Sequence, residues 1–72
     1  RYDRARAKED LLLRSGPSED FLKLDFIEAG KELRVLEERG NWVRVRVQER
    51  VSGWAPKDHV LLFRAPSTTR ES

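Results

Sequence analysis

The 72-residue chain contains no cysteine and a single histidine, His59. Without cysteine the fold has no disulfide bonds, and zinc has no thiolate ligands. A lone histidine does not form a metal site unless carboxylates are placed around it. Nucleophilic catalysis needs a nucleophile, a nearby base and an orienting group, and no serine is marked as a partner of His59. We therefore expect no enzyme, no metal and no other cofactor.

Long apolar runs and blocks of one charge are also missing. No stretch approaches the roughly 18 apolar residues of a membrane-spanning helix, and no signal peptide is visible. Fifteen basic and thirteen acidic residues are interspersed, for a net charge of +2. We therefore do not expect nucleic acid as the main partner. The most basic neighbourhood, Arg44, Arg46 and Arg50, is more typical of a solvated strand face than of an RNA or phosphate contact.

The length allows one domain at most, and a domain of this size buries only about 60% of its unfolded surface. The apolar residues are concentrated between Leu11 and Phe63. We expect an N-terminal tail at 1–3, a domain at 4–63 and a flexible C-terminal tail at 64–72. Because the chain opens without methionine, it reads as a domain of a larger protein, monomeric when isolated.

The segment 42–48 has the clearest strand pattern. Val43, Val45 and Val47 alternate with Trp42, Arg44, Arg46 and Gln48. Alternating side chains of a strand point to opposite faces, so this pattern predicts valines inside and Trp42 outside. Gly40-Asn41 precedes the segment and is a plausible hairpin turn, since both residues tolerate positive φ.

Further short segments with turns between them predict an all-β fold. Apolar runs lie at 11–13, 22–26, 33–36 and 60–63, Gly53–Pro56 reads as a strand closed by proline, and Lys57–His59 as one turn of 3₁₀ helix. Arg4–Lys8 is compatible with a helix start or an edge strand. About five short strands, spaced about ten residues apart, are typical of a small barrel or sandwich.

Four motifs resemble, in order, those of bacterial Src-homology-3 (SH3) domains. They are Leu11–Pro17, Gly30–Leu36, Gly40-Asn41-Trp42 and Gly53-Trp54-Ala55. The resemblance covers about Arg4 to Phe63. It implies an SH3-like barrel with a 3₁₀ turn before the last strand. It also implies a non-catalytic module of the bacterial cell envelope or periplasm that recognises a peptide or protein segment, such as a peptidoglycan peptide.

The segment Gly53–Val60 is also similar to the Gly-Tyr-x-Pro-Ser-Asn-Tyr-Val stretch of eukaryotic SH3 domains. This resemblance gives Trp42 the place of the groove tryptophan, Pro56 that of the groove proline and His59 that of a groove tyrosine. We predict a ligand-binding groove formed by Trp42, Trp54, Pro56 and His59. The eukaryotic Ala-Leu-Tyr-Asp-Tyr stretch, which supplies two further groove tyrosines, has no counterpart here.

Alternatives remain open for several of these residues. Trp42 suits a contact surface or packing against a loop, and Trp54, which follows a glycine, suits a structural role. Arg14 is expected to pair with a carboxylate, and the candidates are Asp10, Glu19 and Asp20. The acidic loop at 18–20 is either solvated or, as in eukaryotic SH3 domains, a contact for a basic peptide residue.

Two other functions compete with peptide recognition. An intramolecular packing module has no free ligand and predicts a broad apolar patch, for example at Phe21, Leu22 and Phe63. An RNA-binding small barrel is the weaker alternative. It predicts a steep salt dependence carried by arginines.

Overall fold

A computed structural model describes residues 2–49 and 51–64 of the chain. The predicted C-terminal tail, apart from Arg64, and also Arg1 and Arg50, lie outside the described residues. The described elements are β1 (Arg4–Ala7), β2 (Leu11–Arg14), β3 (Lys23–Ile27), β4 (Glu32–Arg39), β5 (Trp42–Gln48), β6 (Val51–Pro56), the 3₁₀ turn η1 (Lys57–His59) and β7 (Val60–Phe63). None of the described elements is a helix long and apolar enough to cross a membrane.

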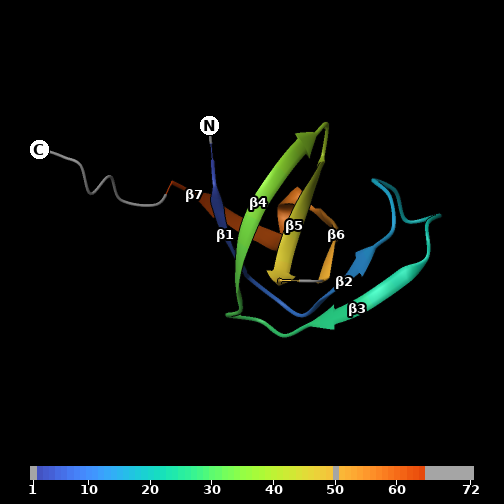
Figure 1. Ribbon diagram of the computed structural model, residues 1–72, viewed down its shortest axis with the longest axis horizontal. Coiled ribbons are helices and arrows are strands. Elements are labelled where there is room, and N and C mark those ends of the chain that lie inside the picture. The colour runs from blue at the N-terminus through green and yellow to red at the C-terminus, as the bar shows by residue number, and fades with distance from the viewer. Residues whose placement is uncertain (1, 50, 65–72) are drawn as a thin grey trace, which may run out of the picture.

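The strands form one antiparallel sheet in the order β3-β2-β6-β5-β4-β1-β7, which curls into a small barrel (Figure 1). The predicted all-β barrel with a 3₁₀ turn before its last strand is therefore confirmed. The described part has seven strand segments where about five were predicted, and Arg4–Ala7 is one of the additional strands. Of the two structures open to the segment 4–8, the strand is the one adopted. It is not an edge strand, because β1 pairs with β4 on one side and with β7 on the other.

The hairpin of β4 and β5 follows the predicted turn. Arg39 pairs with Trp42, so Gly40 and Asn41 form a two-residue connection. Gly40 has φ +56°, a left-handed conformation that glycine adopts without the steric cost of a Cβ atom. This turn sets the register in which Val43 and Val45 face inward.

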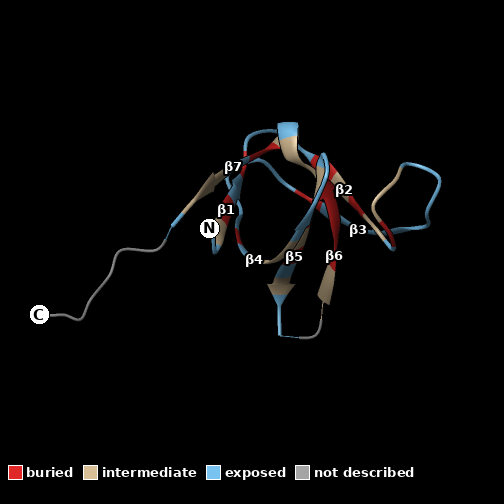
Figure 2. Cartoon of the chain, turned by 90° about the horizontal axis from the view of Figure 1, so that it is seen from above, coloured by how far each residue is buried: buried red, intermediate tan, exposed pale blue. Residues whose placement is uncertain are grey.

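The core lies inside the barrel and consists of small and branched apolar side chains. Its buried members are Ala5, Ala7, Leu11, Leu13, Ile27, Leu33, Val43, Val45, Ala55 and Val60. Val43 and Val45 are fully buried, and Val47 packs against the cluster, as the alternation predicts. Figure 2 shows buried stretches on β1, β2 and β6, whereas the loop between β2 and β3 stands away from the core.

β3 forms one edge of the sheet and is the most exposed strand. Its first four residues, Lys23 to Phe26, are exposed, and only Ile27 is buried. The pairing with β2 shifts register between Leu13 and Arg14. At the free edge, the Phe26 amide N–H donates a hydrogen bond to Asp25 Oδ1, 2.9 Å away. An irregular edge with an engaged amide is a poor template for pairing with another strand.

The paired strands β2 and β6 approach each other closely at Gly53. A Cβ atom at Gly53 would lie 2.9 Å from Leu13 Cβ and 3.0 Å from the Arg14 carbonyl oxygen. One of these two atoms belongs to the backbone, so a larger residue at position 53 requires the two strands to separate. The same strands carry the walls of the groove described below.

We expect Gly53→Ala to lower the free energy of unfolding by about 1–3 kcal/mol, because the added methyl group overpacks the β2–β6 contact. Urea denaturation followed by tryptophan fluorescence measures the change. Ser52→Ala, one residue away and half-buried, is the matched control and should change stability by less than about 0.5 kcal/mol. Equal stability of Gly53→Ala and the parent chain would show that the strands separate without cost.

Candidate binding groove

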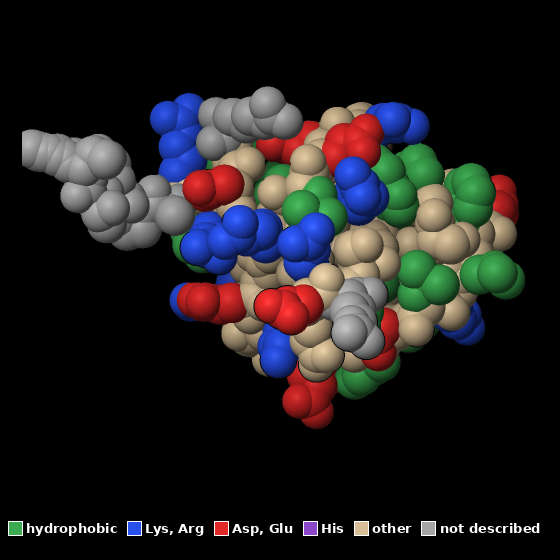
Figure 3. All heavy atoms as spheres, in the orientation of Figure 1, with side chains coloured by type: hydrophobic (Ala, Val, Ile, Leu, Met, Phe, Trp, Pro, Cys, Tyr) green, Lys and Arg blue, Asp and Glu red, His purple; other side chains and the backbone are tan. Residues whose placement is uncertain are grey.

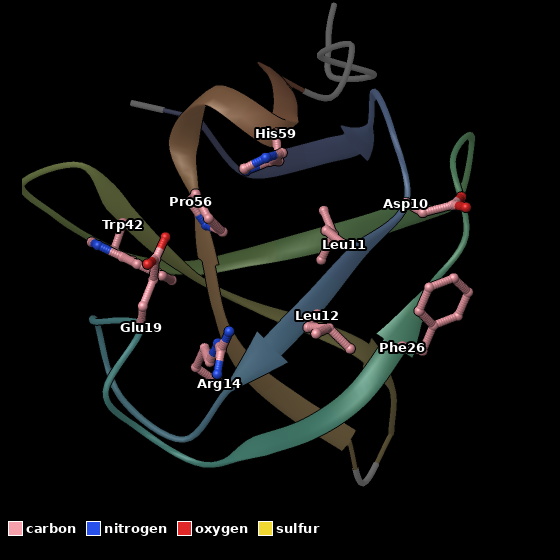
Figure 4. Close-up of a pocket in the computed structure, with 9 residues that line it drawn as sticks. All are labelled: Asp10, Leu11, Leu12, Arg14, Glu19, Phe26, Trp42, Pro56 and His59. Atoms are coloured by element: carbon pink, nitrogen blue, oxygen red, sulfur yellow. The ribbon is translucent and has the colours of Figure 1, made fainter.

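A groove of about 320 Å³ opens on the outer surface of the barrel (Figure 4). It is lined by Asp10, Leu11, Leu12, Arg14, Glu19, Phe26, Trp42, Pro56 and His59. Its volume lies at the small end of the range for ligand sites. Apolar side chains form its middle, and charged side chains stand at its rim. Three of the four predicted groove residues, Trp42, Pro56 and His59, therefore lie around one hollow.

Strand register explains why Trp42 and Pro56 are neighbours. They are directly paired residues at the start of β5 and the end of β6, so their side chains project from the same face. Trp42 is half-buried and points outward, opposite to the buried Val43. The Lys57 amide donates a hydrogen bond of 2.8 Å to the Asn41 carbonyl oxygen, which ties η1 to the β4–β5 turn. The aromatic wall is thus held by two strands and a turn.

His59 reaches the groove from η1. Its carbonyl oxygen accepts a 2.9 Å hydrogen bond from the Lys8 amide, which anchors the turn to the end of β1. Its Nε2 atom lies 3.8 Å from Glu9 Oε2, a distance at which the two attract when the imidazole is protonated. Its Nδ1 atom is buried and has no hydrogen-bond partner in the described part of the chain. The ring thus keeps an unused polar atom beside the groove.

The rim of the groove carries both signs of charge. Asp10 accepts a 2.9 Å hydrogen bond from the Ala29 amide and so holds the β3–β4 turn. Arg14 donates a 3.3 Å hydrogen bond to the Phe21 carbonyl oxygen, and it forms no ion pair with a described residue. The predicted pairing of Arg14 with a carboxylate is therefore wrong, because the returning β2–β3 loop places a carbonyl oxygen within its reach. Glu19, from the same loop, lies near Trp42 in Figure 4.

Trp54, the fourth predicted groove residue, does not line this hollow. It is only 7% exposed. It stands between Arg14 and Arg44 on the paired strands, and the guanidinium carbon of Arg39 lies 5.5 Å from its ring centroid. That distance fits a cation–π contact. The surroundings of Trp54 match the structural role that its position after a glycine favours.

Sequence reasoning did not assign several of the lining residues to the groove. Leu12 is the outward member of the run Leu11–Leu13, whose other two residues are buried, and period-two spacing was the available signal for it. Glu19 belongs to the acidic loop considered above as a peptide contact, and Phe26 belongs to the apolar run that follows it, but neither signal placed them in the groove. They reach the groove only because β3 and its loop fold back beside β2.

The lining residues combine apolar side chains with a few charged ones. They include no serine, threonine, cysteine or lysine. Within the described residues, no group of three or more His, Asp or Glu side chains is arranged to hold a metal ion. The groove offers apolar surface for a side chain and a few charges to orient it.

Comparison with known proteins adds one match. A protein-family model described as the bacterial SH3 domain matches residues 9–60, more than half of the chain. The matched span begins before β2 and ends at the first residue of β7, so it includes every residue that lines the groove. Neither the curated proteins nor the solved structures contain a match.

The two tryptophans should respond differently to truncation. Trp54→Ala removes a buried ring, and we expect it to cost about 3–5 kcal/mol of folding free energy. Trp42→Ala, at a half-buried outward position, should cost much less. Thermal unfolding by circular dichroism measures both. If Trp42→Ala proved the more destabilising, Trp42 would be a packing residue and the groove would lose its aromatic wall.

Proposed function

The chain belongs to the bacterial SH3 domain family, which generally comprises non-catalytic binding modules. On this premise we propose that it binds an extended peptide or protein segment in the groove of Trp42, Pro56 and His59. The observation that carries the proposal is the convergence of these three side chains on one hollow from β5, β6 and η1. Trp54 has a supporting role, since it is buried beside the groove and does not line it.

The lining chemistry supports a peptide with one apolar or cyclic residue beside a polar group. Trp42 and Pro56 provide a rigid apolar wall, which costs little conformational entropy when a ligand is bound. His59 and the charged rim provide hydrogen-bonding and ionic partners. Glu19 forms no ion pair within the described residues and suits a cationic group of the ligand. We propose peptidoglycan peptides as the first candidates, and with them a role in the cell envelope.

We expect the affinity for a single short peptide to be modest. The groove is shallow, and it offers far less area than the roughly 800 Å² per partner of a standard protein interface. Association also costs translational and rotational freedom, which a small contact offsets only in part. Tethering to a larger assembly would raise the effective concentration without new contacts.

Titration of the ¹⁵N-labelled chain with soluble muropeptides tests this proposal, with a Pro-x-x-Pro peptide and a short RNA as parallel probes. Signals of the Trp42 indole and of His59 should shift with one peptide class and stay in place with RNA. Trp42→Ala should weaken that binding by roughly 30-fold, as expected for a tryptophan hot spot worth about 2 kcal/mol.

Tyr2→Ala is the matched control, because Tyr2 is an aromatic residue that is 45% exposed and does not line the groove. It should leave the affinity unchanged. Equal loss in the two variants would place the binding elsewhere. If no peptide shifts the groove signals beyond the effect of salt, recognition of a free peptide by this groove is refuted.

A second candidate function is packing against another protein domain, and an exposed apolar patch favours it. Phe21, Leu22, Leu24 and Phe26 are 46%, 75%, 50% and 54% exposed. They lie along the β2–β3 loop and β3, and Figure 3 shows apolar side chains gathered at that end of the molecule. Phe63, which we also expected in such a patch, belongs to β7 at the opposite edge of the sheet.

Leu22→Ser tests whether the apolar patch contributes to peptide binding, because Leu22 is the most exposed of these side chains and does not line the groove. Under the peptide-binding proposal, its affinity for muropeptides should equal that of the parent chain. The measurement is the same titration. A patch that only packs on another domain would instead give no peptide response in either protein.

A further inference from the structure

Three arginines stand side by side on the outer face of the sheet, away from the groove. Arg4 of β1 is directly paired with Arg34 of β4, and Arg34 is directly paired with Arg46 of β5. Each alternates with a buried or half-buried apolar neighbour, namely Ala5, Leu33 or Val45, so all three side chains point outward. The register therefore builds a row of three like charges across three strands.

In the rows on either side of these arginines, the facing side chains carry opposite charges. Arg6 faces Glu32 across β1 and β4 and forms an ion pair of 3.0 Å with it. Arg44 faces Glu37 across β5 and β4 and forms an ion pair of 3.3 Å. Within residues 2–49 and 51–64, Arg4, Arg34 and Arg46 form no ion pair. Among the described residues, the arginine row thus differs from the ion-paired rows on either side of it.

Like charges that face each other directly on neighbouring strands are destabilising. Arg34 has such a neighbour on both sides. No described carboxylate forms an ion pair with these three guanidinium groups, whereas an anion held between them would remove the repulsion. A row of this kind is therefore expected where an anionic ligand is bound.

The row also borders a hollow. A depression of about 430 Å³ is lined by the three arginines together with Glu32, Leu33, Val47, Gln48 and Glu49. Glu32 is engaged by Arg6, which leaves Glu49 as the acidic group opposed to the three cations. Figure 3 shows basic side chains gathered in a band over β1, β4 and β5. The three arginines therefore outweigh Glu49, and the hollow suits an anion small enough to lie among the guanidinium groups.

We propose that Arg4, Arg34 and Arg46 bind a single phosphate group, either inorganic or as a monoester. Such a group carries a charge of about −1.5 to −2 and three strong acceptor oxygens. The planar guanidinium fork matches these oxygens in a bidentate geometry that lysine does not provide. Neighbouring strands are about 4.8 Å apart, so the outer two arginines stand about 10 Å apart. Their long side chains can converge on one group above Arg34.

This site is independent of the peptide groove, because none of its lining residues lines the groove. A protein with both sites would hold a peptide segment on one face and a phosphate-bearing molecule on another. A soluble phosphate ester and the headgroup of an acidic phospholipid present the same chemistry. The vesicle experiment below separates these two sources.

The test is a titration of the ¹⁵N-labelled chain with inorganic phosphate, with sodium chloride adjusted to hold the ionic strength constant. Amide shifts should be confined to β1, β4 and β5, and the groove signals should not move. Arg34→Gln should weaken phosphate binding at least tenfold, since it removes the central cation. Arg44→Gln is the matched control, with the same change of charge on the same face but outside the row. Its partner Glu37 keeps an ion pair with Arg39 and does not line the hollow, so this variant should retain the affinity within about twofold.

Thermal unfolding gives a second readout that a general charge effect would not reproduce. Without phosphate, Arg34→Gln should unfold at the same temperature as the parent chain or higher, because two repulsive neighbours are removed. Phosphate should raise the unfolding temperature of the parent and of Arg44→Gln, and leave that of Arg34→Gln and Arg46→Gln unchanged. An equal rise in all four proteins, or an equal effect of chloride at the same ionic strength, overturns the proposal.

Vesicle co-sedimentation identifies the source of the phosphate. Vesicles of phosphatidylcholine with phosphatidic acid are compared with vesicles of phosphatidylcholine alone. If the chain binds inorganic phosphate and also the acidic vesicles, the site takes a lipid headgroup. If it binds only inorganic phosphate, the site takes a soluble phosphate. Failure to bind inorganic phosphate overturns the proposal, whatever the vesicles show.

Discussion

The burial of Val43 and Val45 on the inner side of β5 is the constraint on which the outer surface depends. Both side chains are fully buried in a small core, and a shift of the strand by one residue would expose them to water. Because side chains alternate along a strand, this burial forces Trp42, Arg44 and Arg46 to the outside. The aromatic wall of the groove and one member of the arginine row are therefore consequences of the same apolar pattern.

The strands on either side of β5 add residues to two different surfaces, and the orientation of β5 determines where both surfaces lie. At one end, β6 pairs Pro56 with Trp42, and η1 then brings His59 to the same hollow. At the other end, β4 and β1 align two more arginines with Arg46. One central strand thus organises an apolar groove and a cationic depression that share no residue.

Burial on both faces of β6 gives Trp54 a different environment from that of Trp42. Gly53, Trp54 and Ala55 are all buried, although successive side chains point to opposite faces. Ala55 faces the core, and Trp54 is covered on the other side, where Arg39 lies over its ring. A glycine–tryptophan motif alone does not reveal such a cover, because the covering residue comes from another strand. The predicted groove therefore included Trp54 although its position after a glycine favoured a structural role, and the tertiary structure buries it beside the groove.

The sequence by itself determined the features that depend on local periodicity and turn chemistry. These are the all-β barrel, the Gly40–Asn41 hairpin, the 3₁₀ turn at Lys57–His59 and the outward face of Trp42. Only the tertiary structure decided what depends on register between distant strands. Phe26 and Glu19 reach the groove through the fold of the β2–β3 loop, and Arg4 meets Arg34 across thirty positions of sequence. Side-chain alternation specifies a face at every residue, whereas the partner across the sheet is selected by burial of the whole core.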